Sequence, residues 1–352
     1  MEIPEVIFSN NHVLVVNKPA GWKSQPGDRA GGGGDEEGGR GDPKCLLSFL
    51  QSQKLGGGSQ KDFLSPTHRL DQPCTGALIF AKNSKAASRI QTAWGKGRVR
   101  KRYWVVVEGG RSGDAPAARQ GERRRGGKGG TEGDGLELLR RRSVRLDGRG
   151  PRGRQGHAHY RLSAILTSGV RKRGRSDGHA GGSVAVRALP RGPPSAETAR
   201  GDGGRVCHLE WEHLLTLGAN TPTANARHLL SMTTNASVKH QVRALLAVVG
   251  RAPIAGVLRY GHRRLLRGAP HAEDGRHRAG TVERPLPDGS LVLNVREVFL
   301  PTESLGGMSF LAEEPSVADI PRAWRDFFGL RESDVQGLGY LLKGKVLDTD
   351  TT

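Results

Sequence analysis

The run from His68 to Lys82 constrains this chain more than any other stretch; it reads His-Arg-Leu-Asp-Gln-Pro-Cys-Thr-Gly-Ala-Leu-Ile-Phe-Ala-Lys. Arg69 and Asp71 stand just before a tight Pro-Cys-Thr-Gly turn, and the apolar residues 77–81 predict a strand directly after it. A carboxylate placed at the mouth of a fold, with cations near enough to keep it ionised, is a candidate nucleophile. The competing interpretation is an exposed charge pair of little energetic value.

Charge narrows the choice of partner. The 352-residue chain has 55 Lys and Arg against 35 Asp and Glu, a formal net charge of +20. Such an excess favours a polyanion, either nucleic acid or an anionic membrane surface. No apolar run approaches the roughly 18–20 residues that span a bilayer, and no clear amphipathic helix with aromatic anchors is present. We therefore expect nucleic acid and no membrane.

The cysteines indicate neither a metal site nor a disulfide framework. Cys45, Cys74 and Cys207 lie far apart in the sequence without CxxC spacing, which favours a reducing compartment. His157 and His159 lack ligand-set spacing as well. We expect no metal, and the compartment stays open between cytoplasm, nucleus and an organelle such as a mitochondrion or plastid.

Apolar periodicity predicts many strands and a few helices, without regular βαβ alternation. The expected strands are 6–8 and 13–16, paired as a hairpin, then 77–81, 101–109, 157–166, 227–233 and 290–300, and ordered structure is expected to return at 206–216. The expected helices are 45–50, 83–95, 240–250 and 323–328, with Asn83 or Ser84 as the cap of the second. The pattern predicts an α+β fold; the resemblance described below further implies a central mixed, mainly antiparallel sheet with flanking helices and an RNA cleft across it.

Low-complexity stretches interrupt this pattern. Residues 27–43 are Gly-rich and are expected to form a loop that does not order itself. Residues 111–205 hold 22 Lys and Arg against 9 Asp and Glu, and only 157–166 is expected to form a strand there. The rest of that segment is read either as disordered insertion or as an RNA-contacting arm of the RGG type, and the two readings are compatible. We expect residues 1–110 and 206–335 to form the halves of one catalytic domain, followed by a tail at 336–352.

Four motifs occur in an order that resembles the RluA-type RNA pseudouridine synthases. They are Val15–Gly21, similar to the family's "vvnKPaG" opening; His68–Asp71 with Thr75-Gly76 and Phe80–Lys82, similar to its HRLD motif; Lys101–Tyr103 with Glu108-Gly109, similar to its KxY strand; and His240–Arg243 with Gly250, Pro253-Ile254 and Tyr260-Gly261, similar to its HQIR helix. A lone HRLD is weak support. Four ordered matches over about 250 residues are strong.

The resemblance implies the pseudouridine synthase fold and a reaction without cofactor or metal. Asp71 matches the family's nucleophile, Tyr103 its base-stacking tyrosine, and Arg243 the cation that partners the carboxylate. The residues expected to contact RNA are Lys18, Arg69, Lys101, Lys239, His240 and Gln241. Taken alone, Tyr103 on an apolar strand is ordinarily core and Arg243 on a helix ordinarily faces solvent. His68 and His240 are expected to hold loop geometry by hydrogen bonding.

The chain also departs from the family pattern. Residues 236–239 read Ala-Ser-Val-Lys where the family has Thr-Gly-Arg-Thr, and Val257 replaces the usual aspartate. We also expect no S4-type RNA-binding domain before Lys18. These departures mark a divergent member.

Two functions follow. The first is isomerisation of uridine to pseudouridine in structured RNA, with ribosomal RNA expected first and transfer RNA second. The second is a catalytically inactive RNA-binding or ribosome-assembly factor on the same fold, because fold alone does not fix function. The intact set of Asp71, Tyr103 and Arg243 favours the enzyme. We expect a monomer, and association with ribosomal particles stays open.

Overall fold

The computed structural model of the chain describes residues 2–26, 44–56, 63–108, 135–146, 158–170, 183–188, 204–217, 227–234, 238, 240–255, 286, 290–300, 317–333 and 335. The chain forms two compact units. One comprises Met1–Trp104 and Arg284–Gly329, and the other comprises Val105–Glu283 and Leu330–Thr352. Strand β5 (Arg100–Glu108) contributes residues to both.

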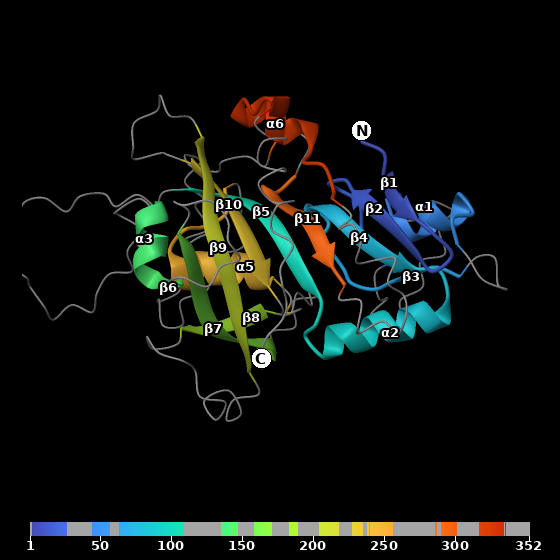
Figure 1. The fold of residues 1–352 in the computed structure, drawn as a ribbon, viewed down its shortest axis with the longest axis horizontal. Helices are drawn as coiled ribbons and strands as arrows, with labels where there is room; N and C mark the ends of the chain where they lie inside the picture. The colour runs from blue at the N-terminus through green and yellow to red at the C-terminus, as the bar shows by residue number, and fades with distance from the viewer. Residues whose placement is uncertain are drawn as a thin grey trace, which may run out of the picture. The chain divides into compact units, whose positions relative to one another are not determined.

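The first unit is built on the buried strand β4 (Thr75–Ala81), in which all seven residues are buried. Its neighbours are β2 (Val13–Lys18), which pairs antiparallel with β4, and β11 (Leu293–Phe299), which pairs parallel with it. β1 (Glu5–Ser9) continues the sheet beyond β2, and β3 (Ser65–Pro66) pairs with β4. Figure 1 shows β1, β2, β4 and β11 as neighbouring arrows. The predicted hairpin and the strand at 77–81 are confirmed.

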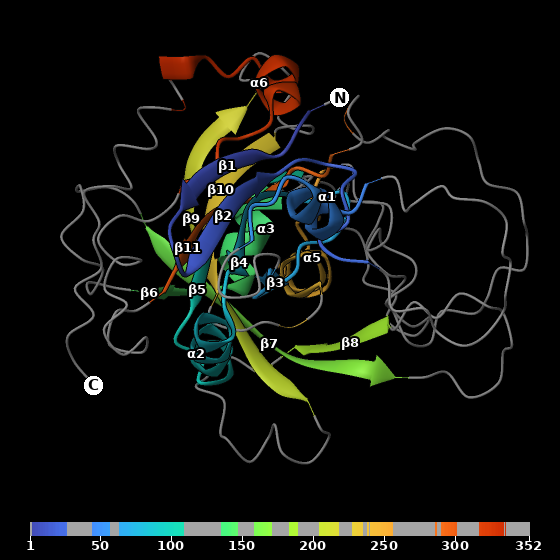
Figure 2. The same cartoon turned by 90° about the vertical axis from the view of Figure 1, so that its right-hand side faces the viewer.

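The helices of this unit are stabilised by capping of the first turn and by burial of apolar side chains. In α2 (Ser84–Gly95) the side chain of Asn83 accepts a hydrogen bond from Ala86 N at 2.8 Å, which satisfies a free amide of the first turn. The buried stripe of α2 consists of Ala86, Ile90 and Ala93. The two short helices α1 (Leu46–Ser52) and α6 (Arg322–Phe328) bury Leu46, Leu50 and Trp324. All three predicted helices are confirmed, and Figure 2 shows α1 and α2 from a second side.

The second unit is an antiparallel sheet with short helices. Its strands are, in spatial order, β10 (Arg227–Thr234), β9 (Arg205–Leu217), β7 (His159–Val170) and β6 (Val144–Leu146), with β8 (Ser183–Ala188) paired to β7. The helices are α3 (Gly135–Arg142) and α5 (Gln241–Ala244), and α5 continues as a π-helix, η3 (Leu245–Gly250). The mixed, mainly antiparallel strands and few helices confirm the α+β class, whereas the RNA cleft stays a prediction.

The expectation of a single strand within 111–205 was wrong. This segment also contributes α3, β6 and β8, and β7 extends past the predicted end at residue 166 to Val170. In α3, Leu136 and Leu139 are buried although charged residues and glycines surround them in the sequence. The Gly-rich stretch 27–43 and most of the Gly-Arg runs lie outside the described residues. The predicted division into two catalytic halves, insertions and a tail stays a prediction.

Gly76 marks the tightest approach between two strands of the first unit. It pairs with Val295 of β11 and has a φ of +112°. A Cβ built there lies 2.6 Å from Val295 N and 2.8 Å from Val295 C, and closer still to Val295 O. Only glycine fits such a conformation and such a space.

We expect Gly76→Ala to lower the free energy of unfolding by about 2–3 kcal/mol, because it adds backbone strain and forces β4 and β11 apart. Urea denaturation of the purified variant measures this loss. Gly95→Ala is the matched control, since a Cβ there meets nothing within 4 Å. Equal stability of Gly76→Ala and Gly95→Ala contradicts the expectation.

Within the described residues, no helix is both long enough and apolar enough to cross a membrane.

Candidate active site

The loop that carries Asp71 is fixed by backbone contacts on both sides. Gly21 N donates to Gln72 O at 2.9 Å, and Cys74 N donates to Asp71 O at 2.9 Å. Leu70 exchanges two hydrogen bonds with the Ser24 hydroxyl, at 3.0 Å from its amide and 2.8 Å to its carbonyl. Asp71 itself is partly buried. These contacts hold the backbone that carries Asp71 in place.

Lys18, at the end of β2, stabilises this loop through its side chain. Its side chain is fully buried, and Nζ donates to the carbonyl oxygens of Pro19 at 3.0 Å, Gln72 at 3.1 Å and Cys74 at 2.7 Å. Burial lowers the pKa of Lys18 to about 8, while the charges of Cys74 and Asp71 act in the opposite direction. All three ammonium protons are donated to the backbone, which favours a structural role for Lys18. The RNA contact predicted for Lys18 stays a prediction.

Lys101 and Tyr103 of β5 lie within electrostatic reach of Asp71. Being two positions apart on a strand, they share one face, and both are buried. Burial lowers the pKa of Lys101 to about 8, and the charge of Asp71 opposes that shift. Burial raises the pKa of Tyr103, and the charges of Cys74 and Asp71 raise it further. The first unit thus gathers a carboxylate, two ammonium groups and a phenol.

The ring of Trp94 on α2 lies close to Lys101. Lys101 Nζ lies 5.0 Å from the centre of the Trp94 ring and 5.9 Å from that of Tyr103, which is cation–π distance. Trp94 lies within the predicted helix 83–95, and no sequence signal pointed to its contact with Lys101.

His68 holds the loop, as its sequence position predicted. Its Nε2 accepts a hydrogen bond from Ile79 N at 3.3 Å, and its ring centre lies 5.4 Å from that of Trp94. Burial lowers the pKa of His68 well below its ordinary value, and the charge of Lys101 lowers it further. A neutral, fully enclosed imidazole serves structure rather than proton transfer. The neighbouring Arg69 is exposed, which suits a phosphate contact.

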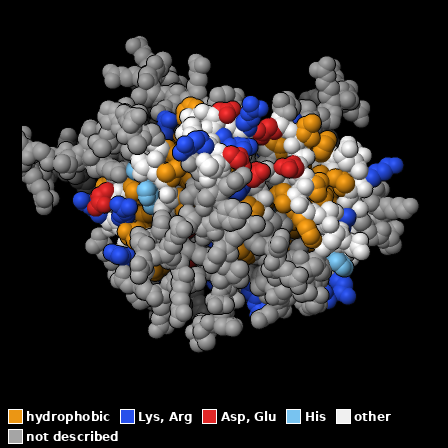
Figure 3. All heavy atoms as spheres, turned by 45° about the horizontal axis from the view of Figure 1, so that its top comes forward, with side chains coloured by type: hydrophobic (Ala, Val, Ile, Leu, Met, Phe, Trp, Pro, Cys, Tyr) orange, Lys and Arg blue, Asp and Glu red, His pale blue; other side chains and the backbone are white. Residues whose placement is uncertain are grey.

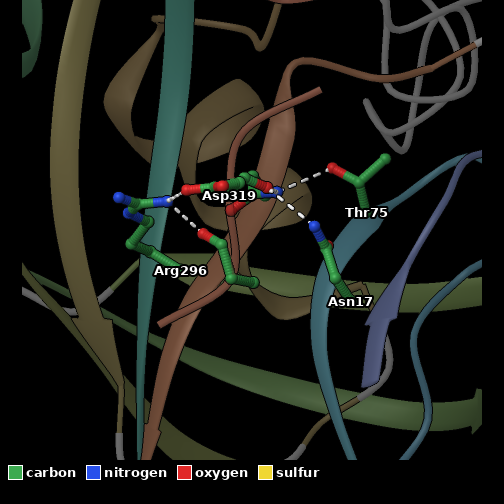
Figure 4. A network of polar contacts seen from close by, with 6 residues as sticks. Asn17, Thr75, Arg296 and Asp319 are labelled. Atoms are coloured by element: carbon green, nitrogen blue, oxygen red, sulfur yellow. Dashed lines mark hydrogen bonds and ion pairs between the residues drawn. The ribbon is translucent and has the colours of Figure 1, made fainter. Parts of the chain in front are cut away.

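A polar network fixes the start of β4, four residues after Asp71 (Figure 4). Asn294 Nδ2 donates to Thr75 Oγ1 at 2.9 Å, and both Asn17 Nδ2 and Asn294 Nδ2 donate to Asp319 O, at 3.2 and 3.4 Å. Arg296 Nη1 donates to Ala318 O and contacts Asp319 Oδ1 at 3.4 Å. The network joins β2 and β11 to the segment before α6, and through Thr75 it ties β11 to the start of β4.

Gln241 and Arg243 lie on α5 in the second unit, and His240 directly precedes it. Gln241 is buried, and its Nε2 donates to Thr234 Oγ1 at 2.6 Å and to His208 O at 3.4 Å. Arg243 is 6% exposed, so it does not face solvent as an isolated helical arginine ordinarily does. His240 caps the helix with a φ of 56°. Lys239 lies outside the described residues, as do Val257 and the departures at 236 and 237. The predicted pairing of Arg243 with Asp71 stays a prediction.

The described surface mixes charges of both signs. On the face drawn in Figure 3, basic and acidic side chains are interspersed among the described residues. Exposed ion pairs such as Arg322–Asp326 at 3.6 Å and Arg161–Glu210 at 2.7 Å follow the same pattern. Among the described residues, no group of three or more His, Cys, Asp or Glu could hold a metal ion.

Comparison with known proteins shows which family the chain resembles. The family model for "RNA pseudouridylate synthase" matches residues 12–248. YhcT of Bacillus subtilis, described as an uncharacterized RNA pseudouridine synthase, is 30% identical over 105 residues, which cover 30% of this chain and 31% of that protein. The dual-specificity RNA pseudouridine synthase RluA of Haemophilus influenzae is 28% identical over 105 residues, covering 30% and 40%. The mitochondrial pseudouridylate synthase RPUSD4 of Xenopus tropicalis is 25% identical over 259 residues, covering 73% and 60%.

One solved structure carries the same fold. Human RNA pseudouridylate synthase domain containing 1 superposes with a TM-score of 0.50 at 15% identity and covers 97% of this chain and 95% of that one. The first two relatives named above are matched over only 31% and 40% of their own lengths. The family model nevertheless spans well over half of the chain, including the Asp71 loop, β5 and α5. The resemblance drawn from four motifs is confirmed, and the chain belongs to the RNA pseudouridylate synthase family.

Proposed function

We propose that this protein converts uridine to pseudouridine in structured RNA. The observation that carries the proposal is the arrangement around Asp71: a carboxylate on a pinned loop, with Lys101 and Tyr103 of β5 within electrostatic reach. The proposed reaction needs no reagent beyond these protein side chains. The reaction breaks the N1–C1′ bond, turns the uracil, forms a C5–C1′ bond, releases the C5 proton and protonates N1.

Each residue has a proposed part. Asp71 assists the departure of uracil from C1′, where positive charge develops on the ribose as the bond breaks. The ring of Tyr103 stacks on the extruded base, and because burial raises its pKa, its hydroxyl stays protonated and acts through hydrogen bonding when the C5 proton leaves. Arg243, by family resemblance, is the cation that partners the carboxylate. Arg69 is proposed to contact phosphate.

The substrate is proposed to be ribosomal RNA first and transfer RNA second. Extruding a base costs least where it is already unpaired, so a loop or bulge is the expected setting. The proposed partner is RNA alone, bound by a monomer. His240, Gln241 and Lys239 remain proposed RNA-binding residues.

Release of the C5 hydrogen gives a direct assay. RNA labelled with tritium at C5 of uridine, extracted from cells lacking the protein, is incubated with the purified chain. We expect tritium in water from the wild-type protein and none from Asp71→Asn, because only C5–C1′ bond formation expels that hydrogen. RNA from cells that contain the protein is the control and should release far less, since its site is already converted. Equal release by both proteins counts against the proposal.

A further inference from the structure

The strand that carries Tyr103 and the strand that follows the Asp71 loop are not neighbours in the sheet. β11 lies between them, in the order β4, β11, β5 (Figure 1). It comes from the C-terminal part of the chain, far in sequence from both. Any displacement of β5 along β11 therefore moves Tyr103 relative to the start of β4, where the loop ends.

β11 is joined to the start of β4 through both backbone and side chains. Asn294 pairs with Thr75 across the two strands, and its Nδ2 donates to Thr75 Oγ1 at 2.9 Å. The residue before Thr75 is in turn bonded to the loop, because Cys74 N donates to Asp71 O at 2.9 Å. β11 therefore has a defined place relative to the loop that carries Asp71.

The apolar residues of β5 give little information about its register against β11. Residues 104–107 read Trp-Val-Val-Val, and all four are fully buried. A shift by one position places one valine where another was, so burial of these residues hardly distinguishes the two registers. The same shift turns Tyr103 to the opposite face of the sheet. The register of β5 therefore needs a further determinant.

A buried ion pair between β5 and β11 supplies this determinant. Arg102 Nη1 donates to Glu297 Oε2 at 2.8 Å, and the two side chains are 7% and 5% exposed. The guanidinium also lies 5.0 Å from the centre of the Phe299 ring, two positions further along β11. Because side chains alternate along a strand, Arg102 points away from the face that Lys101 and Tyr103 share. The pair therefore connects β5 to β11 without occupying the site.

We propose that the Arg102–Glu297 pair sets the register of β5 against β11 and thereby positions Tyr103 for the reaction. The proposal rests on the function proposed above and deepens it. Buried ion pairs contribute little net stability, because desolvation offsets their attraction, and specifying register is their best-attested use. Burial raises the pKa of Glu297, and the charges of Arg102 and Arg296 oppose that shift. A slipped β5 would bury this carboxylate without Arg102, which penalises the wrong register.

Stability and rate together distinguish a positioning pair from a merely structural one. Arg102→Met leaves the Glu297 carboxylate buried without its partner and is expected to lower the melting temperature. Combining Arg102→Met with Glu297→Met replaces the pair by apolar side chains and should restore most of that loss. We expect kcat of the double variant to stay about 10–100-fold below that of the wild type, with little change in KM, because Tyr103 is no longer held in place.

The control is the exposed pair on α6, removed by combining Arg322→Met with Asp326→Met. This variant should keep the wild-type rate. Recovery of both the melting temperature and kcat in the double variant of Arg102 and Glu297 makes the pair merely structural and overturns the proposal. A raised KM with kcat unchanged overturns it as well, because the pair then affects RNA binding rather than the position of Tyr103.

A measurement without substrate separates this proposal from the proposed function. Amide hydrogen exchange of β5 is compared between the wild type, the double variant and Glu297→Gln, which removes only the charge and keeps the shape of the side chain. We expect exchange of residues 100–108 to be at least about tenfold faster in the double variant and faster also in Glu297→Gln, with α2 unchanged as an internal reference. Faster exchange supports the role in register even if no RNA is converted. Unchanged exchange in a folded variant overturns it even if the enzyme is active.

Discussion

Asp71→Ala is expected to lower pseudouridine formation by at least about 10³-fold, the scale on which removing a catalytic nucleophile slows an enzyme. The loss should fall on kcat rather than on RNA affinity, because the loop is held by contacts of Gly21, Ser24 and Lys18 that do not involve this carboxylate's oxygens. Single-turnover kinetics with enzyme in excess over RNA, repeated at several enzyme concentrations, separates the two effects.

The control for this variant is Asp326→Ala, which removes an exposed acid on α6. Both proteins should melt at temperatures close to that of the wild type, so that a loss of rate is not a loss of fold. If Asp71→Ala retains a rate within about tenfold of the wild type, Asp71 is not the nucleophile. The alternative of an RNA-binding factor then becomes the better account of the chain.

Lys18→Met is expected to lower the free energy of unfolding by about 4 kcal/mol, the largest loss that we expect from a single side chain outside the chemistry. The substitution leaves the carbonyl oxygens of Pro19, Gln72 and Cys74 buried without their donor. Removing a buried charge recovers part of this cost, but three unsatisfied acceptors outweigh it. Urea denaturation measures the change, with the exposed Lys96→Met as control.

The same variant isolates a pH effect. The pKa of Lys18 is about 8 when folded and 10.5 at its ordinary value, so between these pH values the unfolded chain binds a proton that the folded chain has released. Stability from this group therefore rises with pH over that window. The difference in unfolding free energy between wild type and Lys18→Met should grow from pH 8 to pH 10. A constant difference shows that Lys18 is not desolvated as its burial indicates.

Local signals predicted most of the first unit. The hairpin, the strand after the Pro-Cys-Thr-Gly turn and the helix capped by Asn83 are set by turn residues, alternation and capping chemistry within a few residues of one another. The sequence left Asn83 and Ser84 as alternative caps, and the 2.8 Å bond from Ala86 N shows that Asn83 is the one.

Elements that depend on distant partners were not predictable in the same way. Helix α3 has the sequence GLELLRRR, whose two buried leucines give little signal on their own. Its burial depends on Gly250, where a Cβ would stand 2.6 Å from Leu139 and 3.4 Å from Leu162. The π-helical turn at 245–250 likewise has the apolar composition of an α-helix, so periodicity could not distinguish the two.

The candidate site shows the same division. Family motifs indicated Asp71, Tyr103 and Arg243, and they gave Lys101 only as an RNA contact. The contact of Lys101 with the Trp94 ring could not be foreseen, because it depends on how α2 packs against the strand. The three carbonyl acceptors of Lys18 were equally hidden, since backbone groups carry no sequence signal.

The measurement that tests the central claim most directly is a transcriptome-wide map of pseudouridine in cells lacking this protein, complemented with wild type or with Asp71→Ala. We expect at least one site to vanish in the deletion, to return with the wild type and to stay absent with the variant, which establishes the activity and identifies the RNA together. If no site changes, or if Asp71→Ala restores what was lost, the protein acts through RNA binding and not through catalysis.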